Sequence, residues 1–240
     1  MGAKNFSGTS TGRVNYYGVS YGALSVRVKE IPEGYEEITA DELKSRSNKK
    51  EDIDLRERYV TKSGDYPYSV FYQSIEGTII GVSKKEPQGM SKMLELEVLD
   101  SDGETSYVSM NLYSKYTENL LNRLTSLDSW NDKNLTLSPY SISNTFPDKK
   151  TGKPVSIYNQ GFSVRVEGVK VEVAYKNDDK KLPPTELIQD AQGNDTTSRV
   201  KRIDFLFDQA MTKFSAVTAK PTSSQKDVDV EVEDESELPF

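Results

Sequence analysis

The stretch SVFYQSIEGTIIGVS, at residues 69–83, limits the possible folds of this chain more than any other segment. Its β-branched and aromatic residues favour a strand, but Gly77 and Gly81 interrupt the pattern. Glycines inside a long strand mark bends or bulges. The segment therefore predicts one strand that bends, as a strand does when it curls around a small barrel.

The residues that follow predict two more strands, then a helix, then further strands. MLELEVLD (93–100) and TSYVSMNLYS (105–114) alternate apolar and polar residues, and Asp102-Gly103 between them is typical of a hairpin turn. KYTENLLNRLTSL (115–127) carries leucines at helical spacing. Further strands are expected at 134–143, interrupted by Pro139, at 155–159 and at 162–175, which folds at Glu167-Gly168, with a loop at 143–154.

The order strand, strand, strand, helix, strand, strand is that of a five-stranded oligonucleotide-binding (OB) barrel. Other all-β arrangements share this order. We predict a mainly β protein whose OB barrel, with added N-terminal strands and two or more short helices, occupies residues 14–214. A flexible N-terminus (1–13) precedes this domain, and a disordered linker and acidic tail (215–240) follow it.

Segments outside the predicted barrel also show recognisable patterns. GVSYGALSVRVKEI (18–31) alternates like a strand, and Thr39 and Glu42 have the spacing of a capping box that begins a short helix. LPPTELIQDAQGNDTT predicts a linker with one helical turn. Residues 198–214 predict a second helix, whose phenylalanines are explained better by packing on the barrel than by a partner surface.

The chain contains no cysteine and no histidine, which excludes disulfides, thiolate nucleophiles, imidazole bases and the usual zinc ligands. KKTGKP lacks the Ser or Thr of a phosphate-binding loop, because Pro154 stands there. FPDKK is similar to part of a nuclease metal site, but no Glu-x-Lys follows it. We therefore expect no cofactor, no metal and no enzymatic activity, with a metal-dependent nuclease as the weaker alternative.

No run of apolar residues is long enough to span a membrane, and MGAKNFSGTSTGR does not have the pattern of a signal peptide. We expect no membrane partner and a cytoplasmic location, in the host cytoplasm if the protein is viral.

Charge is divided unevenly along the chain, whose net charge is −7. Residues 227–240 hold seven of the 38 acids and no base, so the remaining 31 acids balance the 31 bases. The body is therefore neutral, and the acidity of the whole chain does not argue against an anionic ligand.

An OB fold binds oligonucleotides across its second and third strands and with the loops joining strands 1–2 and 4–5. Both loops are locally basic here. Basic side chains neutralise phosphates, and aromatic rings stack on bases. The candidate DNA-binding residues are Lys84, Lys85 and Lys92 in the first loop, Phe146, Lys149, Lys150 and Lys153 in the second, and Tyr72, Tyr107, Tyr113, Tyr158 and Arg165 on strands.

Each of these residues also has a plain structural explanation, as a packed tyrosine or a solvated lysine. Glu95 and Glu97 are expected to point outward on the second strand, where they oppose a DNA backbone. This favours a DNA path nearer the loops than the centre of the sheet.

Charge does not explain the ending DESELPF, because Pro-Phe exposes a ring and a free carboxylate. A shallow apolar pocket beside a basic residue captures such an end. The ending resembles the acidic tip of bacterial single-stranded DNA-binding proteins, which closes in acids, an aliphatic residue, Pro and Phe. The body looks more like a divergent phage-type member, since it has an extra C-terminal helix and lacks the usual Gly/Gln-rich linker.

The resemblance implies non-specific binding of single-stranded DNA during replication, recombination and repair. It also implies that the tip recruits partner enzymes such as a polymerase, helicase or primase. The alternative is an acidic-tailed chaperone or virion component that does not bind DNA. The tip residues that match the family are Asp234, Glu235, Glu237, Leu238, Pro239 and Phe240.

Overall fold

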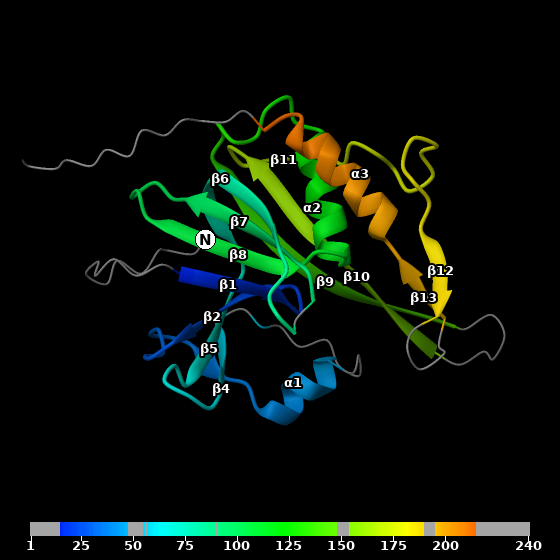
Figure 1. The fold of residues 1–240 in the computed structure, drawn as a ribbon. Helices are drawn as coiled ribbons and strands as arrows, with labels where there is room; N and C mark the ends of the chain where they lie inside the picture. The colour runs from blue at the N-terminus through cyan, green and yellow to red at the C-terminus, as the bar shows by residue number, and fades with distance from the viewer. Residues whose placement is uncertain are drawn as a thin grey trace, which may run out of the picture.

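The computed structural model describes residues 15–47, 55, 57–89, 91–147, 154–189 and 195–214, apart from some side chains within them. These residues form a mainly β structure with a few short helices (Figure 1). The predicted flexible N-terminus (1–13) and the linker and acidic tail (215–240) lie outside the described residues.

Eleven of the described strands belong to one sheet, and two form a separate hairpin. The large sheet contains β1 (Asn15–Ser20), β2 (Ala23–Val28), β3 (Glu36–Glu37), β4 (Arg58–Thr61), β5 (Tyr68–Tyr72), β6 (Ile75–Lys85), β7 (Met93–Leu99), β8 (Thr105–Asn111), β9 (Leu135–Pro147), β10 (Pro154–Val166) and β11 (Val169–Lys170). The hairpin is β12 (Glu186–Gln189) and β13 (Asp195–Ser198), and the helices are α1 (Ala40–Ser47), α2 (Lys115–Thr125) and α3 (Val200–Met211).

The predicted order of three strands, a helix and two strands is present as β6, β7, β8, α2, β9 and β10. These strands lie in the spatial order β10-β9-β6-β7-β8. β6 joins the two halves, because Ile75–Gly77 pairs with β9 and Thr78–Lys85 pairs with β7. A register shift between Ile79 and Gly81 and a tight contact at Gly77, where a Cβ would lie 2.5 Å from a carbonyl oxygen, confirm the predicted irregularity.

The predicted closed barrel is not confirmed, since the sheet is open. β8 pairs with β7 on one side and, in parallel, with β1 on the other. The N-terminal strand therefore extends the sheet at the third strand of the predicted barrel. β2, β5, β4 and β3 continue the sheet beyond β1.

Two predicted strands are divided in the structure. The segment 69–83 forms β5 and β6, because β5 pairs with β2 while β6 turns to β9 and β7. The segment 18–31 forms most of the β1–β2 hairpin, whose turn at Tyr21-Gly22 has φ values of 53° and 80°. Positive φ at both turn positions matches the twist of a two-residue hairpin.

The strands at 134–143, 155–159 and 162–175 were also placed wrongly in detail. β9 and β10 are each 13 residues long and occupy part of the predicted loop, and Pro139 does not interrupt β9. The proline is tolerated because pairing with β6 ends at Leu137, while the opposite residue, Phe162, donates its N–H to Asn119 Oδ1. The predicted turn at Glu167-Gly168 is confirmed. The expected linker before α3 contains β12 and β13.

The main core lies between the large sheet and α2, and α3 packs on α2 (Figure 1). The short helix predicted after Thr39 and the helices predicted at 115–127 and 198–214 are confirmed as α1, α2 and α3. Phe205 and Phe207 pack against the main core, as expected. Trp130 is fully buried and donates Nε1–H to the carbonyl of Ala210 at 3.0 Å. Among the described helices, none is long and apolar enough to cross a membrane.

Candidate nucleic-acid interface

A stacked pair of tyrosines lies on the outer face of β1 and β8. Strand alternation buries Val108 and Met110 and turns Tyr107 away from the core. The parallel register places Tyr16 of β1 directly beside Tyr107. Their ring centroids are 5.1 Å apart with an interplanar angle of 14°, and 60% of Tyr16 is exposed. The pair therefore offers an aromatic surface to a flat ligand.

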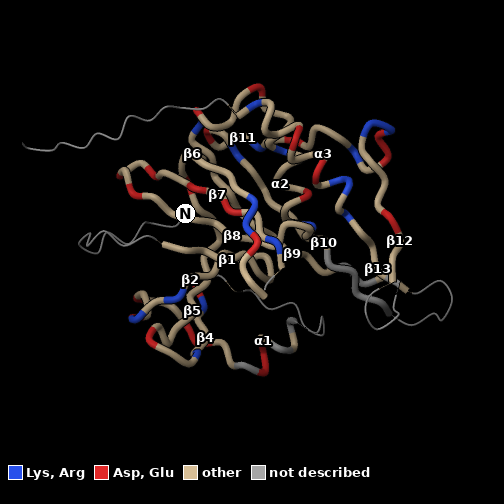
Figure 2. Tube along the Cα trace, in the orientation of Figure 1, with Lys and Arg blue, Asp and Glu red and all other residues tan. Residues whose placement is uncertain are grey.

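The three lysines predicted for the first loop, Lys84 and Lys85 at the end of β6 and Lys92 just before β7, are each paired with an acid. The Nζ of Lys84 is 3.0 Å from Asp204 of α3 and 4.2 Å from the centroid of the Phe207 ring. The other two pairs are Lys85 with Glu95, at 3.5 Å, and Lys92 with Glu86, at 3.3 Å. Figure 2 shows basic and acidic residues interleaved over this part of the molecule.

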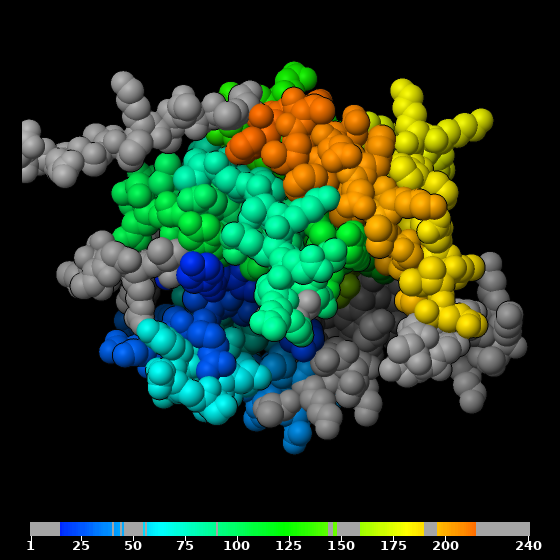
Figure 3. All heavy atoms as spheres, viewed as in Figure 1, coloured from blue at the N-terminus to red at the C-terminus, as the bar shows by residue number. Residues whose placement is uncertain are grey.

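A hollow of about 470 Å³ opens beside the tyrosine pair. Figure 3 shows β1, in dark blue, and the β6–β7 connection, in turquoise, on the same face of the molecule. The hollow combines an aromatic side, a small hydroxyl and an ion pair, and its lining includes Tyr16, Tyr107, Ser109, Met93, Lys85 and Glu95. We call it the outer hollow.

Glu95 and Glu97 lie on the outer face of β7, as the sequence predicted, and Glu95 lines the outer hollow. Glu97 pairs across the strands with Tyr107 and accepts a hydrogen bond from its hydroxyl at 3.4 Å. The charge of Glu97 raises the pKa of Tyr107, so this hydroxyl stays protonated and able to donate. These acids do not attract a phosphate to the outer face of β7.

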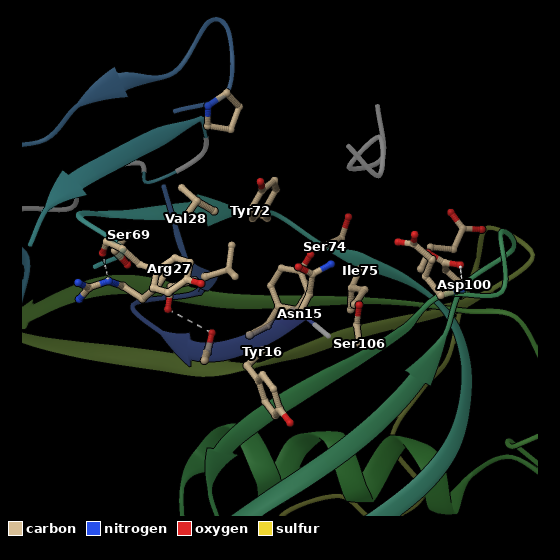
Figure 4. Close-up of a pocket in the computed structure, with 18 of the residues that line it drawn as sticks. Asn15, Tyr16, Arg27, Val28, Ser69, Tyr72, Ser74, Ile75, Asp100 and Ser106 are labelled. Carbon is tan, nitrogen blue, oxygen red and sulfur yellow. Dashed lines mark hydrogen bonds between the residues drawn. The ribbon is translucent and has the colours of Figure 1, made fainter. Parts of the chain in front are cut away.

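Tyr72 lies on the opposite face of the sheet from Tyr107, which corrects the predicted site. Neighbouring residues of a strand point to opposite faces, so Tyr17 points inward where Tyr16 points outward. Tyr72 packs on Tyr17 with ring centroids 6.0 Å apart and on Tyr35 at 5.9 Å. Figure 4 shows Tyr16 turned away from the side on which Tyr72 lies.

Tyr72 lines a larger cavity, of about 1290 Å³, between the N-terminal strands and the β7–β8 turn. Burial is the main cause that raises the pKa of Tyr17 to about 12 and also raises the pKa of Tyr72. At one end Arg27 donates to the carbonyls of Tyr66 and Ser63, and at the other end the lining is acidic, with Glu76, Asp100, Asp102 and Glu104. This inner cavity is poorly suited to phosphates.

The remaining candidates are not brought to the outer hollow. Tyr113 lies beyond the end of β8 and packs against the core. Phe146 is 54% exposed on β9, and Arg165 is exposed on β10, where it donates to the carbonyl of Gly168. β6 and β7 separate these two strands from β8 and β1.

Several predicted residues lie outside what the structure describes. Tyr158 is placed on β10, but its side chain is not described. Neither the backbone nor the side chains are described for the lysines of the second loop (Lys149, Lys150 and Lys153) or for the tip (Asp234, Glu235, Glu237, Leu238, Pro239 and Phe240). Among the described residues, no three carboxylates are grouped closely enough to hold a metal ion.

No family model, no curated protein and no solved structure matches the chain. Its function is therefore inferred from its own residues.

Proposed function

We propose that this protein binds single-stranded DNA non-specifically, through the outer face of β1, β7 and β8. The exposed stack of Tyr16 on Tyr107 beside the outer hollow carries the proposal. Bases of a single strand are free to stack on such rings, whereas paired bases in a duplex are not. The binding would serve replication, recombination and repair.

The strand arrangement supports this choice of face. The spatial order β10-β9-β6-β7-β8, with α2 between β8 and β9 in the sequence, supports an OB-like unit. We propose that the unit is an OB barrel opened by β1, which adds Tyr16 to the surface. The face of the second and third strands, here β7 and β8, is the usual oligonucleotide surface of such a unit.

The paired lysines affect how the strand would lie. Acids at Glu95 and Glu97 repel phosphates from the centre of the face, so the bases would point toward the sheet. Lys85 and Lys92 are about half exposed despite their ion pairs, and they would exchange an acidic partner for a phosphate at the edge. We expect weaker salt dependence than a site of unpaired lysines would give.

The acidic tail would recruit a polymerase, helicase or primase through residues 234–240 and compete with DNA for the basic side chains. As a flexible coil, residues 215–240 would span about 28 Å, which is enough to cross a small domain. Tethering makes the local tail concentration on the order of millimolar. Deleting residues 227–240 should raise DNA affinity at low salt and abolish recruitment. We place both activities in the cytoplasm, that of the host if the protein is viral.

An acidic-tailed chaperone or virion component that does not bind DNA is the second candidate. It is favoured by the acidic partners of Lys84, Lys85 and Lys92. The two functions differ in strand selectivity, because the second candidate has no reason to distinguish single-stranded from double-stranded DNA.

A titration of labelled single-stranded and double-stranded oligonucleotides across a range of salt, with and without Mg²⁺, separates these functions. We expect tighter binding to the single strand, weakened by salt, without cleavage. Equal or absent binding of both forms would favour the second candidate. Cleavage that depends on Mg²⁺ would instead indicate a nuclease.

A further inference from the structure

The outer hollow presents a specific set of hydrogen-bonding groups beside its aromatic surface. Glu95 pairs across the strands with Ser109, in the row next to that of Tyr107 and Tyr16. Its side chain is 18% exposed and lies 3.5 Å from the Nζ of Lys85, which is 53% exposed. A base that packs against the tyrosines over Ser109 would therefore meet a carboxylate with an ammonium group beside it.

A carboxylate next to an ammonium group matches one base better than the others. Guanine has two adjacent donors, N1–H and the N2 amino group, followed by the O6 acceptor. The donors fit the two oxygens of a carboxylate, and O6 fits an ammonium donor. Thymine has a single donor between two acceptors, so a carboxylate facing its edge accepts one hydrogen bond and meets one acceptor.

We propose that the outer hollow is a guanine-preferring subsite, in which Glu95 accepts from N1–H and N2–H and Lys85 donates to O6. This inference rests on the proposed binding of single-stranded DNA. It adds a base preference at one position to a contact that elsewhere depends on stacking and charge. Unpaired bases in a single strand leave this edge free to be read.

Glu86 supplies a matched control for Glu95. Glu86 lies in the β6–β7 connection and Glu95 in β7, and both acids line the outer hollow and pair with a lysine. Glu86 is 70% exposed, however, and its partner is Lys92. Replacing either acid with glutamine removes one negative charge, so both variants should show the general electrostatic effect of that loss on DNA affinity.

The test compares three short oligonucleotides by competition in fluorescence anisotropy at fixed salt. One is all thymidine, one carries a single central guanine, and one carries hypoxanthine there, which keeps N1–H and O6 but lacks the N2 amino group. We expect the guanine strand to bind at least about fivefold more tightly than all-thymidine, the lower end for a good bidentate contact. The hypoxanthine strand should lose most of that gain, and Glu95→Gln should remove it while Glu86→Gln keeps it.

The failures of the two proposals are distinguishable. If no oligonucleotide binds, the proposed function itself fails. If all three strands bind the unchanged protein equally, single-strand binding stands and the guanine subsite is refuted, whatever the variants do. A guanine preference that survives in Glu95→Gln, with the fold verified by circular dichroism, would refute the assignment to Glu95.

Discussion

The packing of α3 on α2 should depend on one carboxylate in a largely buried ion network. Glu118 of α2 accepts from Arg199 Nε at 2.9 Å and from Arg202 Nη1 at 3.0 Å. The exposed fractions of these side chains are 16%, 21% and 10%, so water screens the charges only weakly. Glu118→Ala would leave two guanidinium groups without their acidic partner.

The expected loss in the free energy of unfolding follows from the burial of these three side chains. Removing one partner of a buried pair costs about 3–5 kcal/mol. Because these side chains keep some contact with water, and because Arg202 also donates to the carbonyl of Pro183, we expect the lower end, about 3 kcal/mol. Glu118→Gln should cost less, since an amide oxygen still accepts a hydrogen bond.

The chain offers a matched control on the same helix. Lys201 of α3 pairs with Glu186 at 2.6 Å, but their side chains are 71% and 46% exposed. Exposed pairs contribute little, so Glu186→Ala should leave stability nearly unchanged. Urea unfolding followed by the fluorescence of Trp130, which is the single tryptophan of the chain and is fully buried, measures both variants. Equal urea midpoints for Glu118→Ala and Glu186→Ala would refute the reasoning.

Two further predictions concern the N-terminal strands. Gly22 and Gly34 have φ values of 80° and 85°, but a Cβ would lie 2.4 Å from the Ser141 nitrogen at Gly22 and would meet nothing at Gly34. Gly34→Ala should lower the free energy of unfolding by about 1–2 kcal/mol, because of its backbone conformation alone, and Gly22→Ala should lower it clearly more. Equal decreases in the melting temperature of the two variants would contradict the clash at Gly22. The Tyr17 pKa of about 12 exceeds its usual 10, so between pH 10 and 12 the unfolded chain releases a proton that the folded chain keeps. Stability, measured by urea midpoints, should therefore fall with rising pH in that window, and it should fall less in Tyr17→Phe. An equal fall in Tyr17→Phe would show that Tyr17 is not its cause.

Local patterns predicted much of the fold because they depend on residues close in sequence. Alternation gave the inward and outward faces of β7 and β8, and leucine spacing gave α2. The capping box is present as expected: Thr39 N–H donates to Glu42 Oε2 at 2.8 Å, and Glu42 N–H donates to Thr39 Oγ1 at 3.2 Å. In each case the partner lies within a few residues.

The candidate site depends on contacts between distant residues, which local patterns do not encode. Tyr16 was missed because alternation indicates a face but not the neighbouring strand, and β1 reaches β8 by a parallel pairing across much of the chain. The ion pair of Lys84 was missed for the same reason, since its partner Asp204 lies 120 residues away. The short run NYYGVS, whose two tyrosines and valine favour a strand, was the available signal for Tyr16.

Single-stranded DNA binding by a variant that lacks both stacked rings tests the central proposal most directly. If bases stack on Tyr16 and Tyr107, the double variant Tyr16→Ala/Tyr107→Ala should bind a thymidine oligonucleotide at least about fivefold more weakly, the effect of losing one stacked base. Tyr107→Phe, which keeps the ring, should bind nearly as well as the unchanged protein. Undiminished affinity in the folded double variant would contradict the account.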